Sequence, residues 1–294
     1  MELQQLRYVV AVAETSNFTR AAERCHVVQS ALSHQIAALE RELGTRLFER
    51  TSRRVRLTPA GEAFLPAARE CLEAADRARA EVAAASGEIR GGLAIGAIPT
   101  VAAVNLPVAL KTYRRHHPRV RVTLLSAGSE ELIERVRRGV VDIAFLGLPP
   151  HAEPKGVQSH RLGAGELVAV VAPDHHLREH ETDLRGLADE PFIDFRTGHA
   201  GRAQSDEAFT AAGVRREVPF EVSSAEFMVD LVRQGLGVGM LPAAYAPRFP
   251  DLRIIRLRDA PTRAEHLIWT NRPSPATTAF LNLIRPTPAT TSPT

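Results

Sequence analysis

The chain has 294 residues, 44% of them hydrophobic and 24% charged, and its 37 Lys and Arg slightly outnumber its 34 Asp and Glu. This size and apolar content exclude a disordered chain and predict two or more domains with buried cores. No apolar run reaches the roughly 20 residues that span a bilayer, and the start MELQQLRYVV lacks the pattern of a secretion signal, so we expect a cytoplasmic protein with no membrane partner.

The first part of the chain predicts three short helices joined by tight turns. From Leu3 to Ala13 apolar residues recur at the spacing of an amphipathic helix. Asn17 is a good cap for a second helix. In the third, SALSHQIAALEREL (30–43), the apolar residues share one face and Gly44 predicts the end. This succession is typical of a helix-turn-helix.

The third predicted helix carries short polar groups at its front. In a helix-turn-helix, the second helix of the motif enters the major groove by its N-terminal end, where amide and hydroxyl groups can pair with base edges. The basic segment that follows would lie against phosphates or the minor groove and fix the register. The predicted DNA-binding residues are Gln29, Ser30, Ser33, His34, Gln35, Arg50, Arg53 and Arg54. A solvated polar helix with nearby arginines is the alternative.

A long helix is predicted from Pro59 to about Ser86, with Thr58 as its cap. Its apolar residues recur at close to 3.5-residue spacing, which predicts a partner helix; a helix lying on its own domain is the alternative. The two cysteines, at apolar helical positions, are expected to be reduced packing thiols. The predicted stripe is Phe64, Ala67, Cys71, Ala74, Ala78, Val82 and Ala85.

From Leu93 onward, β-like runs alternate with helical patterns, which is typical of βαβ units and a mostly parallel sheet. Strands are expected at LAIGAI, VRVTLLS, DIAFLG, ELVAVVAP, PFIDF, REVPFEVSS, GVGMLP and HLIWTN. Helices are expected at 100–116, 129–138, 205–212, 225–234 and within SPATTAFLNLI. The Pro/Thr-rich end, 287–294, is expected to be disordered.

In α/β structures built from such units, ligands bind at strand C-termini and helix N-termini, where free N–H groups favour carboxylates. Three loops meet this description: Pro99-Thr100, Gly128-Ser129 and Ser223-Ser224. The alternative for each hydroxyl is a plain helix cap.

Residues 17–61 closely resemble the winged helix-turn-helix of LysR-type transcriptional regulators. Matching elements are Phe18 with the Ala21-Ala22 pair, the Q-x-A-L-S-x-Q-I-x-x-L-E-x-x-L-G pattern at 29–44, the L-F-x-R wing at 47–50 and L-T-x-A-G at 57–61. Val28 and Ser30 stand where the family commonly has Ser and Pro, and Cys25 replaces a usual Leu. Because Val cannot cap through its side chain, the first turn of the recognition helix is where a difference is expected.

The resemblance covers essentially the whole chain and implies a fold. An N-terminal all-α winged helix-turn-helix would be followed by a long linker helix and by a C-terminal α/β two-lobed effector domain resembling periplasmic binding proteins. The expected boundaries are 1–58 for the DNA-binding domain, 59–90 for the dimerising linker, and 91–286 for the effector domain, with lobe I at 91–162 and 266–286 and lobe II at 163–265.

The resemblance also implies a function. The protein would bind promoter DNA sequence-specifically as a homodimer or homotetramer, and a small-molecule effector in the interlobe cleft would change that binding or the DNA bend and so the action of RNA polymerase. Thr100, Ser129 and the segment Phe195, Arg196, Thr197 would line the cleft, with Arg196 suited to an anionic effector. Some relatives sense oxidants through effector-domain cysteines, but here both cysteines precede residue 91.

Other signals are discounted. GLGVGM (235–240) follows a helix and precedes a strand, the reverse of a nucleotide-binding glycine loop. His175, His176 and His180 lie in a polar loop without a carboxylate or cysteine cluster to complete a site, so no metal and no cofactor is expected. An enzyme would need acid and base residues that the sequence does not reveal, and a solute-binding protein would need a secretion signal.

Overall fold

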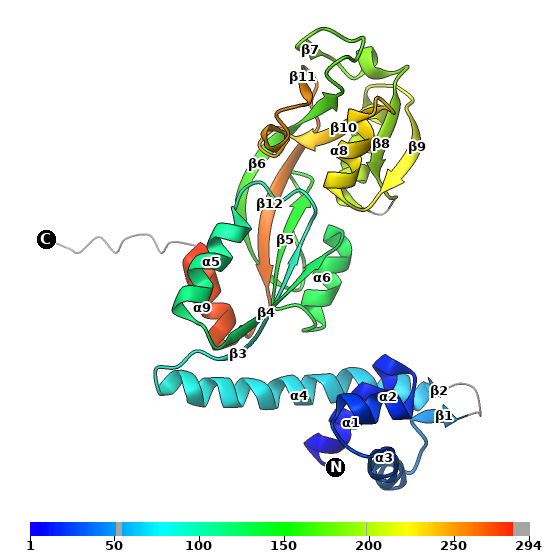
Figure 1. Ribbon diagram of the computed structural model, residues 1–294, viewed down its shortest axis with the longest axis vertical. Coiled ribbons are helices and arrows are strands. Elements are labelled where there is room, and N and C mark those ends of the chain that lie inside the picture. Colours follow the sequence, from blue (N-terminus) through cyan, green and yellow to red (C-terminus); the bar gives the residue numbers. More distant parts are fainter. Residues whose placement is uncertain (51–54, 198, 285–294) are drawn as a thin grey trace, which may run out of the picture. The chain divides into compact units, whose positions relative to one another are not determined.

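The computed structural model describes residues 1–50, 55–197 and 199–284 (Figure 1). The chain forms two compact units, Met1–Glu88 and Ile89–Thr294, and each is described by itself. Among the helices of the described residues, none has the length and apolar character required to cross a membrane. The tail expected to be disordered, 287–294, lies outside the described residues.

The first unit holds the three short helices, the long helix and a small hairpin (Figure 1). The two short strands form the wing, and they pair antiparallel. The elements are α1 (Leu3–Thr15), α2 (Phe18–Arg24), α3 (Gln29–Leu43), β1 (Phe48–Arg50), β2 (Val55–Leu57) and α4 (Pro59–Ala85).

Local signals set the helix ends. The Asn17 side chain accepts hydrogen bonds from the N–H groups of Thr19 and Arg20 at 2.9 and 3.0 Å, and so caps α2. Val28 makes no side-chain cap, yet α3 still begins at Gln29. Gly44 ends α3 in the left-handed conformation, with a φ of 69°. In place of a side-chain cap, the Val28 backbone carbonyl accepts from the N–H groups of Ala31 and Leu32 at 3.1 and 3.3 Å.

The wing is fastened to the helices at both ends. One carboxylate oxygen of Glu40, on α3, accepts from the N–H groups of Leu47 and Phe48 at 2.8 and 3.2 Å. On the other side, a Cβ at Gly61 would lie 2.1 Å from the Leu47 carbonyl oxygen, so the first turn of α4 packs there only without a side chain. The last position of the L-T-x-A-G pattern is therefore glycine for a steric reason.

The second unit is a two-lobed α/β structure around one ten-stranded sheet. The strand order is β4-β3-β5-β12-β6-β10-β8-β9; off this path, β11 pairs with β6, and β7 pairs with β11. The elements are β3 (Gly91–Ala97), α5 (Leu106–His116), β4 (Val120–Ser126), α6 (Ser129–Arg137), β5 (Ile143–Leu148), β6 (Gln158–Val171), β7 (Glu181–Thr182), β8 (Pro191–Phe195), α7 (Ala200–Ala211), β9 (Glu217–Val222), α8 (Ala225–Arg233), β10 (Val238–Pro242), β11 (Arg253–Leu257), β12 (Thr262–Trp269) and α9 (Pro275–Ile284).

The sheet is mixed, which corrects the expectation of a mostly parallel one. Strand β3 is parallel to β4 and β5 in one lobe, and β8 is parallel to β9 and β10 in the other. The long strands β6 and β12 pair antiparallel with each other and run from one lobe into the other (Figure 1). Two shared strands therefore connect the lobes.

Several element bounds differ from those expected. The helix predicted from Thr100 begins only at Leu106, because the Asn105 side chain caps it by accepting from the Val108 N–H. Helix α7 begins at Ala200 rather than Ser205, and β6 starts at Gln158, ahead of the predicted ELVAVV run. The first half of β6 is largely exposed and contains glycines, so it lacks the apolar alternation that marks a strand.

Candidate DNA-reading and effector sites

Helix α3 is divided as its sequence suggested. Leu32, Ile36 and Leu39 are fully buried in the core of the first unit. Gln29, Ser30, His34 and Gln35 are exposed, and Ser33 is half-buried. The polar end of α3 is thus presented to solvent by a helix whose opposite face cannot shift without disturbing the core.

Helix α1 orients one of these polar groups. Gln5 is buried, accepts a 2.9 Å hydrogen bond from the Glu2 N–H, and donates from Nε2 to the Gln35 Oε1 at 3.2 Å. While that bond persists, the Gln35 carbonyl oxygen is engaged, and bidentate pairing with adenine requires both ends of the amide. Gln29, the other glutamine at this end of α3, is exposed, and its amide makes no such hydrogen bond among the described residues.

The wing arginines are only partly described. Arg53 and Arg54 lie outside the described residues, and of Arg50 only the backbone is described, at the end of β1. Arg56 on β2 is exposed, opposite Glu49 in the hairpin register.

Thr100 is the centre of a buried polar network. Arg263 on β12 donates from Nη1 to the Thr100 hydroxyl at 2.8 Å and from Nη2 to Glu265 at 2.6 Å. Glu265 in turn accepts from the N–H groups of Ala102 and Ala103 at 3.0 and 2.9 Å. Burial lowers the pKa of Arg263, and the carboxylate of Glu265 opposes this shift. Thr100 is buried, and its hydroxyl holds the loop after β3 instead of opening a helix.

Sequence reasoning missed the pair Arg263 and Glu265. Both are less than a tenth exposed, although the residues are charged. Their spacing of two residues within a β-strand places both side chains on one face of the sheet. This two-residue spacing could have revealed the pair, but the strand was predicted to begin only at His266.

Ser129 is also internal. Its hydroxyl donates to the Gly147 carbonyl at 3.0 Å and accepts from the Gly147 N–H at 3.1 Å, which ties α6 to β5. The N-cap of α6 is Gly128. A Cβ at Gly128 would lie 3.5 Å from the His199 ring, so this helix start in one lobe faces the start of α7 in the other.

The second lobe contributes the end of β8 and the start of α8. Phe195 is buried and stacks on His199, with ring centroids 5.8 Å apart. Arg196 is exposed, as is Thr197, whose hydroxyl donates to Glu221 at 3.3 Å. Ser224 caps α8 by accepting from the Phe227 N–H, so the cap alternative holds for it. Ser223 is exposed and Pro99 half-buried.

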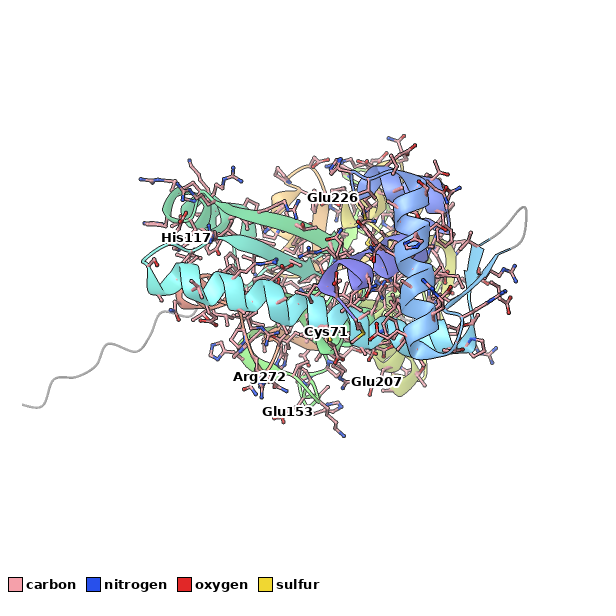
Figure 2. The ribbon with its side chains drawn as sticks, turned by 90° about the horizontal axis from the view of Figure 1, so that it is seen from below. Cys71, His117, Glu153, Glu207, Glu226 and Arg272 are labelled. Carbon is pink, nitrogen blue, oxygen red and sulfur yellow. The ribbon has the colours of Figure 1, made fainter. Side chains whose placement is uncertain are left out.

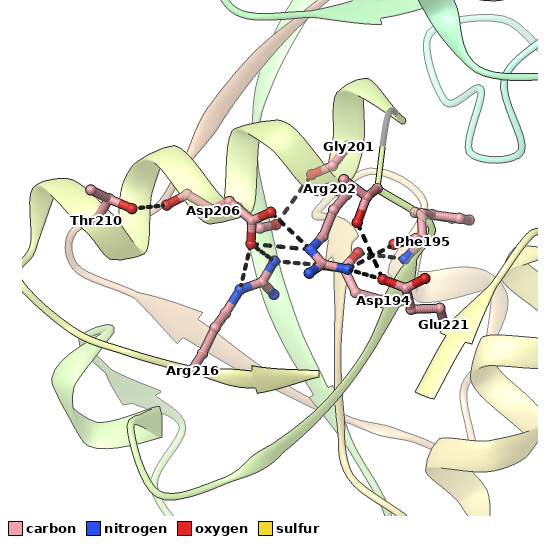
Figure 3. A network of polar contacts seen from close by, with 10 residues as sticks. Asp194, Phe195, Gly201, Arg202, Asp206, Thr210, Arg216 and Glu221 are labelled. Atoms are coloured by element: carbon pink, nitrogen blue, oxygen red, sulfur yellow. Dashed lines mark hydrogen bonds and ion pairs between the residues drawn. The ribbon is translucent and has the colours of Figure 1, made fainter. Parts of the chain in front are cut away.

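An ion-pair network fixes the backbone around Phe195 (Figure 3). The Arg216 side chain, 4% exposed, places Nη2 2.7 Å from Asp194 and 2.6 Å from Asp206. The approach to Asp194 Oδ2 is an ion pair and not a directed hydrogen bond. Burial raises the pKa of Asp194, and Arg216 acts in the opposite direction. Arg202 extends the network to Glu221 at 2.9 Å.

The predicted stripe along α4 lies on its exposed side. Phe64 is half-buried, whereas Cys71 is exposed and so is not a packing thiol within one chain (Figure 2). Val82 is 70% exposed. Cys25 is half-buried, and burial raises the pKa of its thiol. Exposed together on this stripe are Ala67, Cys71, Ala74, Ala78, Val82 and Ala85.

Two family models match the chain, one in its N-terminal part and one in its C-terminal part. The family model for the bacterial regulatory helix-turn-helix protein, lysR family, matches residues 3–62, and that for the LysR substrate binding domain matches residues 86–289. A probable hydrogen peroxide-inducible genes activator of Mycobacterium avium is 37% identical over 82% of this chain and 78% of its own length.

Two solved structures extend the likeness. A full-length OxyR variant from Pseudomonas aeruginosa has a TM-score of 0.71 and 29% identity, with 97% of this chain and 95% of that chain covered. CbnR complexed with its target DNA has a TM-score of 0.70 and 28% identity, with 97% and 99% covered.

A winged helix-turn-helix, a long helix and a two-lobed α/β unit together define a transcriptional regulator that binds DNA and is modulated by a small-molecule effector. The chain belongs to the LysR family of such regulators, whose members act through DNA binding and not through catalysis.

Proposed function

We propose that two copies of the chain pair through the exposed stripe of α4 and present two α3 helices to half-sites in successive major grooves. The observation that carries this proposal is α3 itself, with an exposed polar end above a face buried in the core. The solvent-facing apolar stripe on α4 supports pairing, because exposed apolar residues at this spacing are typical of a helix that packs against a partner helix. A pair of such pairs would make the homotetramer.

In this proposal, the residues of α3 and of the wing have different roles. Gln29, Ser30, Ser33, His34 and Gln35 contact base edges, with Gln29 the strongest candidate for bidentate pairing. Arg50, Arg53 and Arg54 contact phosphates, as would Arg56, which is exposed on β2.

The effector would bind where the two lobes meet. Support comes from the start of α6 facing the start of α7, since free N–H groups at a helix start favour an anion, and from exposed Arg196 at the end of β8. Gly128, Phe195, Arg196, Thr197 and Ser223 would contact a small anionic effector, and Pro99, Thr100, Ser129 and Ser224 would shape the wall around it.

Effector binding would select one arrangement of the lobes, and in this way change promoter binding or bending and the recruitment of RNA polymerase. The shared strands β6 and β12 support such a coupling, because a rotation of one lobe must twist strands that the other lobe also uses. The chain would act in the cytoplasm, where promoter DNA lies.

Gel retardation of the DNA upstream of the chain's own coding sequence tests the proposal. Binding that discriminates this DNA from random DNA and weakens steeply with salt is expected. Sedimentation of the free protein should give a dimer or tetramer. A strictly monomeric protein that binds both DNAs equally would overturn the proposal.

A further inference from the structure

Two adjacent histidines and a glutamate meet at one end of lobe II. His175 and His176 follow β6, and Glu190 precedes β8. His175 Nε2 lies 3.4 Å from one oxygen of Glu190, and His176 Nε2 lies 2.9 Å from the other. The carboxylate that the sequence alone could not place beside these histidines is therefore supplied by the next segment of the chain.

The spacing of these atoms suits one small cation. One ligand atom from each residue lies within 4.8 Å of the other two. In a tetrahedral zinc site with bonds of about 2.1 Å, ligand atoms are roughly 3.4 Å apart. Small side-chain movements would bring all three into that range. The two imidazole rings are already stacked, with centroids 4.5 Å apart.

Burial gives the cluster a reason to bind a cation. The Glu190 side chain is only 11% exposed, and its close partners among the described residues are the two imidazoles. A nearly buried carboxylate needs compensating charge, and a bound divalent cation would supply it. His176 is 71% exposed, so an ion can reach the cluster from solvent.

We propose that His175, His176 and Glu190 form a zinc-binding site of lobe II, separate from the proposed effector region. Two imidazole nitrogens and one carboxylate oxygen are borderline ligands that suit Zn²⁺ and leave a fourth, tetrahedral position for water. The bound ion would join the loop after β6 to the start of β8, two segments that β10 separates in the sheet.

Binding requires a defined local change. Without an ion, the Leu177 N–H donates to His175 Nδ1 at 3.3 Å, which leaves the imidazole proton on Nε2. Coordination through Nε2 displaces that proton, so Nδ1 becomes the protonated nitrogen and the contact with Leu177 is released. The loop at 174–177 should therefore move when the ion binds.

Titration of the tag-free full chain with Co²⁺, followed by displacement with Zn²⁺, tests the site. Tetrahedral Co²⁺ gives intense visible absorption bands, and we expect one equivalent per chain that Zn²⁺ abolishes. Glu190→Gln and His176→Ala should each weaken Zn²⁺ affinity by at least about tenfold. His180→Ala, an exposed histidine in the same loop, is the matched control and should bind as the parent does.

The outcomes are distinct. Equal Zn²⁺ affinity in the parent, Glu190→Gln and His176→Ala would overturn the site, as would a Co²⁺ spectrum typical of an octahedral, water-bound ion. Because His176 is largely exposed, His176→Ala should fold as the parent does, and circular dichroism with retained DNA binding would verify that. The metal measurement needs neither DNA nor effector, so its result is independent of the proposed regulatory role.

Discussion

Arg263 on β12 and Thr100 in the loop after β3 are joined by a 2.8 Å hydrogen bond between a buried guanidinium and a buried hydroxyl. The same guanidinium pairs with Glu265, whose carboxylate also holds the N–H groups of Ala102 and Ala103. A strand shared by both lobes thus fixes the loop that the sequence assigned to the effector.

Arg263→Met should destabilise the second unit by about 3–5 kcal/mol, because it leaves the buried Glu265 carboxylate without its cation. Thr100→Val should cost only about 1 kcal/mol. Urea denaturation followed by the fluorescence of Trp269, the only tryptophan, measures this unit specifically. Equal, small losses in the two variants would contradict the network.

Gln29→Ala should lower the ratio of operator to random-DNA affinity by about tenfold or more, which corresponds to the loss of one bidentate base contact of roughly 1–3 kcal/mol. Ser33→Ala should act in the same direction. Binding isotherms on both DNAs measure the ratio, and an unchanged ratio for Gln29→Ala would refute the assigned role.

Arg56→Ala should weaken binding to operator and random DNA alike and reduce the slope of log affinity against log salt by about 1, because a phosphate contact carries no sequence information. Titrations at several salt concentrations provide the slope. A selective loss on the operator alone would mean that the wing reads bases.

Ala78→Glu should shift the chain from oligomer towards monomer, because it buries a charge in the proposed α4 pairing stripe. Arg79→Glu introduces the same side chain at an exposed α4 position on another face of the helix and serves as the control. Sedimentation velocity distinguishes them. If both variants remain oligomeric, another surface forms the interface.

The second unit should lose stability as the pH falls below about 6.5. His266 is buried, neither of its ring nitrogens has a hydrogen-bond partner among the described residues, and burial lowers its pKa below the usual 6.5. The unfolded chain therefore takes up this proton first, so stability is intact above 6.5 and is lost as the pH falls towards the folded pKa. His266→Leu should flatten the profile measured by Trp269 fluorescence, whereas an unaltered slope would assign the effect to other groups.

Much of the fold was accessible from the sequence. The α3 face, the Asn17 cap and the strand PFIDF all follow from local periodicity and capping, and the structure has them. The wing hairpin and the two lobes came instead through resemblance. Both kinds of prediction depend on patterns within a single segment.

The features that sequence reasoning missed depend on distant partners. Helix α5 begins later than predicted because Asn105, and not Thr100, precedes and caps it. The antiparallel β6–β12 pair brings together segments far apart in the chain. The internal partners of the Thr100 and Ser129 hydroxyls, Arg263 and Gly147, also come from other segments of the chain. Glu190 could be assigned to the histidines only when the fold placed them side by side.

The contact between Gly61 and the Leu47 carbonyl leaves no room for a methyl group. The direction of the α4 axis and the position of the wing are consequently coupled, because neither can change without the other. If α4 joins two copies, the angle between those copies also determines where each wing contacts the sugar–phosphate backbone. A larger residue at position 61 would therefore break the link between the geometry of the dimer and the contact of the wing with DNA.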